Sequence, residues 1–262
     1  LHRLTTTGVS LPAGQSIALA APSLDESLDP ADRQSVLDEI AGGIGWQRFS
    51  RDSYVAPIEI DMSYIKDSGG NRVGHLVDVA FVVHADIDRL RDRDLMKETF
   101  GSENGPPDDH GYRAEELSGD ELTEWGVVDE RSESSNLAIG MPLLDRVLVD
   151  GVIHVEHVEN GDAISISCLL DRRFSSDDPS KSRNRWSRIE EVDAKTTHPY
   201  TGAGGYLCIS RLTELPDACL VQTRMVIHEP SGWFSGSNLL RSKLPLMIQE
   251  SVRKFRRKLN SP

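Results

Sequence analysis

The sequence predicts an α+β fold in which a curved antiparallel sheet wraps around one long C-terminal helix. Strand-like runs joined by hairpin turns fill most of residues 58–227, and adjacent hairpins build antiparallel sheets. The chain then ends in a stretch whose apolar residues share one helix face: Leu240, Leu244, Ile248, Val252, Phe255 and Leu259, widened by Leu239 and Met247. A lone helix cannot bury such a stripe, so the sheet is expected to receive it.

The bulk composition is typical of a soluble globular protein. The chain has 262 residues, of which 38% are hydrophobic and 27% charged, and this length is ample for a core. No apolar run approaches the roughly 20 residues needed to cross a bilayer. The net charge of −13 argues against a nucleic-acid partner, because phosphate binding needs a surplus of Lys and Arg.

The C-terminal segment is basic although the whole chain is acidic. From Ser231 onward, seven Lys and Arg residues stand against Glu250 alone, a local charge of +6. Basic residues near a helix C-terminus complement the helix dipole and remain in water. The sharper alternative is contact with an anionic membrane surface.

The cysteines indicate neither a disulfide framework nor a zinc site. Cys168, Cys208 and Cys219 lie inside strand-like segments, and their number is odd and their spacing irregular. We expect buried thiols and a reducing, cytoplasmic compartment. The start at Leu1, without methionine, leaves export after removal of a leader open, although the first residues lack the apolar core of a signal peptide.

The N-terminal part is expected to contain an arm followed by a helix. Residues 1–28 are rich in Thr, Ser, Ala, Pro and Gly without periodicity, which predicts an extended arm. Asp29 then suits the cap of a helix and Pro30 its first position, and Gly42-Gly43 end it. No linker or repeat divides the remainder, so residues 29–262 are interpreted as a single domain.

Alternating apolar and polar residues predict the strands. The first hairpin pairs 58–64 with 73–83, and the Asn160-Gly161 dipeptide is a strong signal for another hairpin. Further strands are expected at 137–144, 147–158, 163–170, 206–212 and 219–227. The other segments are a helix at 86–99, a loop at 101–111, a short helix within 115–125 and a polar surface loop at 172–187.

The final turn and helix carry a family resemblance. The last hairpin, the turn Glu229-Pro230-Ser231-Gly232-Trp233-Phe234 and the helix with Leu244-Pro245 resemble the C-terminal end of START-like domains, in the SRPBCC (birch-pollen-allergen-like) superfamily. The resemblance is clearest from Gly204 to Leu259. Pro245 removes one helical hydrogen bond, so the helix either begins near Leu244 or is kinked at Pro245.

The resemblance implies a helix-grip fold with an elongated apolar cavity between the sheet and the helix. The superfamily uses this cavity to hold lipids, sterols and other hydrophobic molecules, so we expect a hydrophobic small molecule or a lipid as the partner. The expected ligand contacts are Thr223, Met225, Trp233, Phe234, Leu240, Leu244 and Met247. For Trp233 and Phe234, a plug of the core is favoured over a ligand clamp.

Two alternatives stay open. Some superfamily members are enzymes, so a cyclase-like activity on an aromatic or polyketide-like substrate is possible; it needs a buried general acid or base. A scaffold or interaction module with a filled cavity is the other. We lean toward a protein that binds its ligand without catalysis and without a cofactor.

The remaining polar candidates have simpler explanations. His154 and Glu156 share one strand face while His157 and Glu159 share the other, so we expect no metal site from them. In the last strand, Gln222 and Arg224 alternate with Thr223 and Met225. We expect the arginine side to face solvent, because an unpaired buried charge is very costly.

Overall fold

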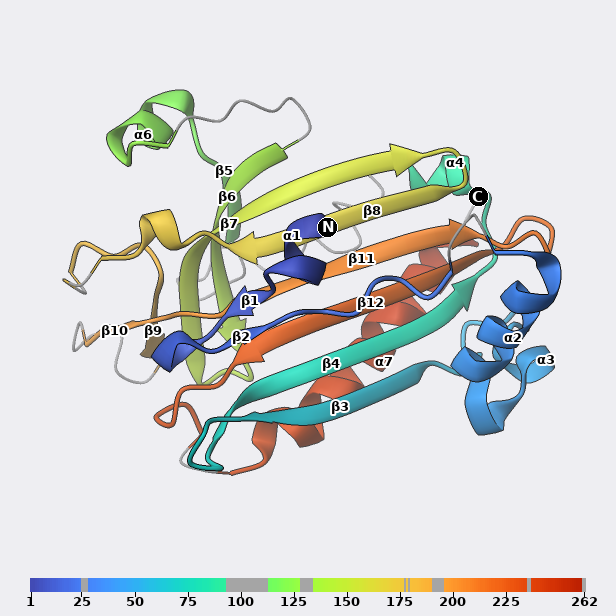
Figure 1. Cartoon of the computed structure of the whole chain (residues 1–262), viewed down its shortest axis with the longest axis horizontal. Helices are drawn as coiled ribbons and strands as arrows, with labels where there is room; N and C mark the ends of the chain where they lie inside the picture. Colours follow the sequence, from blue (N-terminus) through green and yellow to red (C-terminus); the bar gives the residue numbers. More distant parts are fainter. Residues whose placement is uncertain are drawn as a thin grey trace.

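The computed structural model describes the chain except for residues 25–27, 93–112, 128–133, 177, 179, 190–195, 235–236 and 261–262. Within the described residues, ten antiparallel strands form one large sheet (Figure 1). Its strands are β3 (Glu59–Lys66), β4 (Arg72–Val83), β5 (Arg113–Glu116), β6 (Ser134–Leu143), β7 (Val147–Asn160), β8 (Ala163–Leu170), β9 (Arg185–Arg188), β10 (His198–Pro199), β11 (Ala203–Arg211) and β12 (Cys219–His228).

The order of the strands places the first hairpin of the sheet beside its last strand. From one edge the order is β3, β4, β12, β11, β8 and β7, and β4 is paired with β12 along its length, with Val77 opposite Met225. One edge of β7 pairs with β8 and, further along, with β9, and the other edge pairs with β6. Strand β5 in turn pairs with β6. The predicted hairpins are confirmed; Gly161, at a φ of 43°, makes the turn between β7 and β8.

Helix α7 (Leu239–Leu259) lies along one face of this sheet, which we call the inner face. Figure 1 shows α7 behind β4, β12 and β11. The predicted α+β helix-grip arrangement, an antiparallel sheet packed on a long C-terminal helix, is therefore confirmed. The helix begins at Leu239 and continues through Pro245, so the alternative in which it begins near Leu244 is wrong.

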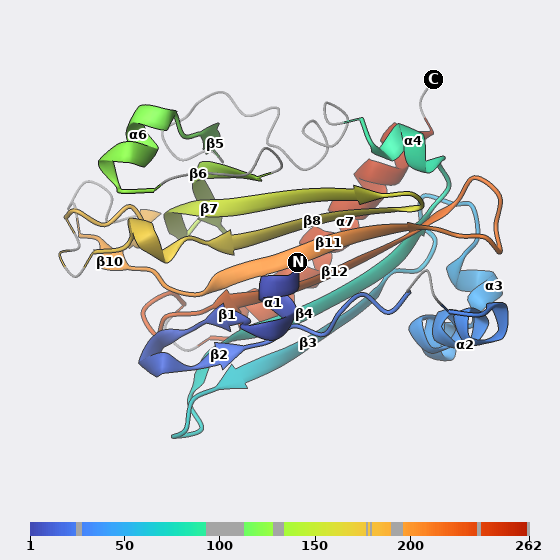
Figure 2. The ribbon, with the colours of Figure 1, turned by 45° about the horizontal axis from the view of Figure 1, so that its top comes forward.

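The opposite, outer face is covered by the N-terminal part of the chain. Its elements are α1 (His2–Thr6), β1 (Val9–Ser10), η1 (Pro12–Gly14), β2 (Ser16–Ile17), α2 (Pro30–Ala41), η2 (Gly42–Ile44) and α3 (Trp46–Phe49). Figure 2 shows the first of these lying across β11 and β12. Helix α2 begins as predicted, because the Asp29 carboxylate accepts hydrogen bonds from the main-chain N–H groups of Ala31 and Asp32.

The arm is more ordered than the extended segment that the sequence predicts. Strands β1 and β2 pair with each other, and apolar residues of the arm pack against outer-face side chains of the sheet. This cluster contains Leu4, Val9, Leu11, Leu19, Ile65, Tyr206, Cys208 and Val226. The division of the chain at residue 28 stays a prediction.

Three short helices complete the described structure: α4 (Ile87–Leu90), α6 (Gly119–Glu124) and η3 (Arg172–Phe174). The predicted helix at 86–99 is observed only over α4: Arg91 and Asp92 are not helical, and residues 93–99, together with the loop at 101–111, lie outside the described residues. The predicted short helix within 115–125 is observed as α6, which Ser118 caps after β5 ends at Glu116. The expected loop at 172–187 contains η3 and the start of β9.

Candidate functional site

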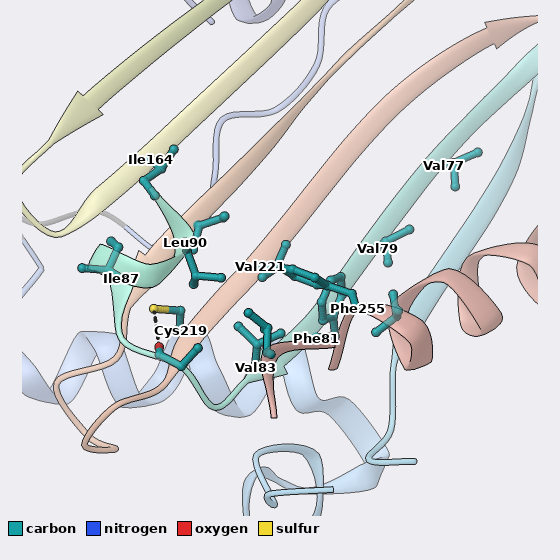
Figure 3. Packing of buried hydrophobic residues seen from close by; sticks show 14 of the residues in the cluster. Val77, Val79, Phe81, Val83, Ile87, Leu90, Ile164, Cys219, Val221 and Phe255 are labelled. Carbon is teal, nitrogen blue, oxygen red and sulfur yellow. Dashed lines mark hydrogen bonds between the residues drawn. The ribbon is translucent and has the colours of Figure 1, made fainter. Parts of the chain in front are cut away.

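Helix α7 is held at both ends by tightly packed apolar clusters. At its C-terminal end Val252, Phe255 and Leu259 pack against Val79, Phe81 and other buried side chains of the sheet, a group we call the C-end cluster (Figure 3). Phe255 and Leu259 are at most 2% exposed. The neighbouring Arg256 is also buried and donates to the main-chain carbonyl oxygens of Val82, Ala56 and Pro57. The C-terminal half of α7 is thus fixed to the sheet.

At the N-terminal end of α7 a second group, the N-end cluster, is built on aromatic rings. Trp233 stacks on Tyr200 with ring centroids 5.5 Å apart and lies edge-on to Trp186 and Phe234. Leu240 packs into the same cluster. Trp233, Phe234 and Leu240 are 3%, 6% and 1% exposed, so these three predicted contacts form part of a closed wall.

Between the two clusters lies a section of the core that is only half-buried, which we call the middle section. On α7 it contains Leu244, which packs against both clusters, and Ile248. On the inner face of the sheet it contains half-buried side chains of β8, β11 and β12: Ile166, Leu207, Thr223 and Met225. The structure therefore brings the predicted residues Thr223, Met225 and Leu244 to this section.

Met247 lies elsewhere. Its side chain is 46% exposed, beside Leu246 at 58%. Successive residues of an α-helix are about 100° apart around the axis, so Met247 turns away from the sheet when Ile248 faces it. The expectation that Met247 widens the buried stripe is wrong, and its assignment as a ligand contact has no support from its position.

A buried polar network closes the inner face beside the first turn of α7. His75 on β4 is 1% exposed, and its Nε2 lies 2.5 Å from the carboxylate of Glu229, which is itself 5% exposed. The other carboxylate oxygen of Glu229 accepts from the Arg72 guanidinium at 2.8 Å. Arg72 also donates to the Asn238 side chain at 2.7 Å, so the network joins β4 to the start of α7.

The sequence analysis missed this network, although a signal for it exists. His75 occupies an inner-face position in a strand whose other inner-face residues, Val77, Val79 and Phe81, are apolar and buried. A polar residue at such a position needs a partner. The partner, Glu229, is 154 residues away along the chain, and no local spacing reveals it.

The polar residues of β12 and the histidines of β7 lie on the strand faces that the sequence predicts. Arg224 points to the outer face and forms an ion pair with Asp78, and Gln222 accepts from the main-chain N–H of Ser23. This confirms that Thr223 and Met225 face inward. His154 and His157 project from opposite faces of β7, and no group of three or more potential metal ligands occurs among the described residues.

Two grooves occur away from the inner face, and both are lined by charged side chains. One of about 440 Å³ lies on the outer face between α2 and the sheet, next to Glu59, Asp61 and the Asp78–Arg224 pair. The other, of about 470 Å³, lies over β5 to β7 beside Trp125 and is bordered by Arg113, Arg183, Arg185 and Asp150. Neither is suited to a purely apolar ligand.

Comparisons with known proteins detect similar solved structures but no close relative. No protein-family model and no curated protein matches the chain. Human STARD10 aligns with a TM-score of 0.46 and 10% sequence identity, over 90% of this chain and 84% of that one. The human StarD13 (DLC2) lipid transfer and protein localization domain aligns with a TM-score of 0.43 and 11% identity, over 78% and 86%. An uncharacterized protein from Rhizobium leguminosarum aligns with a TM-score of 0.35 and 8% identity, over 77% and 99%.

Proposed function

We propose that this chain binds a hydrophobic small molecule of the lipid type between the inner face of the sheet and the middle of α7. The supporting observation is the contrast along the helix: both ends are packed to nearly complete burial, whereas Leu244, Ile248 and the side chains opposite them are half-buried. Protein interiors are normally close-packed, so half-buried apolar side chains in the middle of this helix–sheet contact favour a ligand that covers them. An apolar section with few polar groups is the usual character of a small-molecule site.

The contacts follow from the two sides of the middle section. Met225, Leu207 and Ile166 provide the apolar floor from three adjacent strands, and Leu244 and Ile248 provide the roof. Thr223 adds a hydroxyl group on the same face. Trp233 and Phe234 bound the site as part of the N-end cluster. Covering this surface stabilises the complex by roughly 25 cal/mol per Å² of apolar area removed from water.

Two experiments test the proposal: identification of co-purified lipid, and a substitution that adds bulk to the middle section. Native mass spectrometry after gentle purification, followed by extraction with organic solvent, identifies co-purified lipid. Binding of Nile red, a neutral dye that fluoresces in apolar surroundings, is then measured for the wild-type chain and for Met225→Trp, which adds volume to the middle section. We expect the substitution to weaken dye binding at least tenfold, because the added ring takes the place of the ligand.

Val158→Trp is the matched control, since Val158 projects from the outer face of β7 and is 45% exposed. It should leave dye binding unchanged. Urea unfolding of both variants reports whether they fold. A folded Met225→Trp variant that binds the dye as well as the wild type refutes the proposed site.

A second property, contact with an anionic membrane surface, is proposed for the exposed side of α7. Leu246 and Met247 form an exposed apolar pair there, and Lys243 and Lys254 are also exposed. Apolar side chains within a basic helix face combine hydrophobic insertion with attraction to anionic lipid. Within the described residues no helix is long and apolar enough to span a membrane.

Vesicle flotation tests the contact. We expect the chain to float with phosphatidylcholine vesicles that contain about one third phosphatidylserine and to remain at the bottom with phosphatidylcholine alone. Replacing Lys243 and Lys254 by Glu should abolish flotation, whereas Lys181→Glu, at a residue exposed far from α7, should not. Flotation that is insensitive to lipid charge and to salt contradicts the proposal.

A further inference from the structure

The side chain of His75 carries one ring nitrogen that the protein satisfies and one that it does not. Nε2 is held by Glu229 at 2.5 Å, and because a carboxylate only accepts hydrogen bonds, Nε2 carries the proton. In the neutral ring Nδ1 is then a lone-pair acceptor. Nδ1 is buried and has no hydrogen-bond partner among the described residues. Arg72 binds the far side of Glu229 and fixes this orientation.

The position of His75 in β4 places its ring beside the end of the proposed ligand site that lies near the start of α7. In the register of the sheet His75 is opposite Ile227, and the next inner-face residue of β12 is Met225, which belongs to the middle section. Neighbours that are offset by two residues across adjacent strands still lie within reach of long side chains and their ligands. Ile227 in turn packs against the N-end cluster.

A second buried ring nitrogen without a partner lies in that cluster. Nε1 of Trp233 is an N–H donor, and no described residue accepts its hydrogen bond. Buried polar atoms are almost always paired, because an unmade hydrogen bond costs the desolvation of the group. An acceptor on His75 and a donor on Trp233 therefore remain unsatisfied at the same end of a mainly apolar site.

We propose that a hydroxyl group of the ligand donates a hydrogen bond to Nδ1 of His75, so that the site selects an apolar molecule ending in an alcohol. This inference rests on the proposed function. A carboxylate is disfavoured there, because it cannot donate and it would face a lone pair backed by the Glu229 anion. A cationic amine is disfavoured by the cost of burying its charge among apolar side chains. A hydroxyl group is neutral and can both donate to His75 and accept from Trp233.

Competition for bound Nile red tests the preference with three probes of equal chain length: 1-dodecanol, its methyl ether and dodecanoate. For the wild-type chain we expect the alcohol to bind about tenfold more tightly than the ether, which cannot donate, since one buried hydrogen bond typically contributes a factor of this size. Dodecanoate should bind more weakly than the alcohol. A wild-type chain that binds alcohol and ether equally overturns the inference.

Substitution then locates the preference. His75→Phe keeps an aromatic ring but removes the acceptor, so alcohol and ether should bind with equal affinity while ether affinity is retained. His154→Phe, on the outer face of β7, is the control and should keep the tenfold preference. A folded His75→Phe variant that still prefers the alcohol contradicts the assignment to His75.

A measurement on the unmodified protein covers the case in which His75→Phe fails to fold. With ¹⁵N-labelled histidine, the Nδ1 resonance of His75 should shift when 1-dodecanol is added and remain in place when the methyl ether is added. Equal shifts with both probes refute the hydrogen bond. If Nile red and all three probes fail to bind the wild-type chain, the proposed function itself is wrong, and the two failures are thereby distinguished.

Discussion

At the scale of single residues, the most informative groups are buried ring nitrogens. His75 and Trp233 each carry a buried ring nitrogen without a hydrogen-bond partner among the described residues, and His228, adjacent to Glu229, shows how burial changes the pKa of a histidine ring. Desolvation lowers the pKa of His228 to about 4, although a main-chain hydrogen bond to Thr201 and the charge of Glu229 oppose the shift. Its ring stacks on Tyr200, so protonation would disturb the edge of the N-end cluster.

The depressed pKa of His228 predicts a loss of stability in acid. Between pH 6.5 and about 4 the unfolded chain binds a proton at this residue that the folded chain does not, so the free energy of unfolding falls as the pH falls. The full effect is on the order of 3 kcal/mol, is absent above about pH 6.5 and does not grow below pH 4. Urea unfolding of the wild type and His228→Gln at pH 7.5 and pH 4.5 measures it.

Other groups titrate in the same range, so the quantity to compare is the difference between the two proteins at each pH. We expect His228→Gln to lose less stability on acidification than the wild type. His2→Gln, at an exposed position, is the control and should follow the wild type. Parallel pH dependence of His228→Gln and the wild type contradicts the assignment.

At the scale of elements, α7 carries an internal proline that its packing tolerates. Pro245 has no N–H, so the carbonyl oxygen of Arg241 lacks its helical partner. The residue lies in the segment that borders the half-buried middle section, between Leu240, which is closely packed, and Ile248. We therefore expect this part of α7 to be the least stable portion of the helix.

Replacing Pro245 by Ala should strengthen this segment. The restored N–H can donate to Arg241, and we expect a gain of about 1–3 kcal/mol in the free energy of unfolding, since an internal proline costs roughly 3 kcal/mol. Hydrogen exchange over residues 239–249 should slow as well. Ser251→Ala, at an exposed position of the same helix, should change stability by less than about 0.5 kcal/mol. An unchanged or lower stability of Pro245→Ala contradicts this explanation.

Elements with strong local signals could be predicted from sequence. Asp29-Pro30 indicates the start of α2, Asn160-Gly161 the turn between β7 and β8, and the alternation around Thr223 and Met225 correctly separates the inner from the outer face of β12. Each of these signals depends only on neighbours in the chain, which is why it can be recognised without knowledge of the tertiary structure.

The features that sequence could not predict depend on distant partners. The arm appears irregular in sequence, because Val9 and Leu19 are buried only by the outer face of the sheet. The periodicity of α7 includes Met247, but only the docking angle of the helix decides that this residue is exposed. His75 and Glu229 meet because β4 lies beside β12.

At the scale of the whole molecule, the sheet is covered on both faces, by α7 on the inner face and by the N-terminal arm on the outer face (Figure 2). The arm is therefore expected to contribute to global stability. Leu19→Ala, at a residue 2% exposed, should lower the free energy of unfolding by about 2–4 kcal/mol. Arg3→Ala, exposed in the same arm, should have little effect.

Urea unfolding measures both substitutions. Because Leu19 packs against the outer face, its truncation should leave Nile red affinity at the inner face nearly unchanged in conditions where the variant is folded. A Leu19→Ala variant as stable as the wild type would show that the arm is only loosely attached.

The pairing of β4 with β12 also determines when the protein can fold. Cys219 donates a hydrogen bond to Ala85, 134 residues earlier in the chain, and the β3–β4 hairpin has no other strand neighbour in the described sheet. Contacts between such distant segments form slowly, because a long loop must close first. We therefore expect the apolar inner-face residues of β4 to stay uncovered during synthesis until β12 and α7 have left the ribosome. We expect this uncovered apolar face to be prone to aggregation until β12 and α7 pack on it.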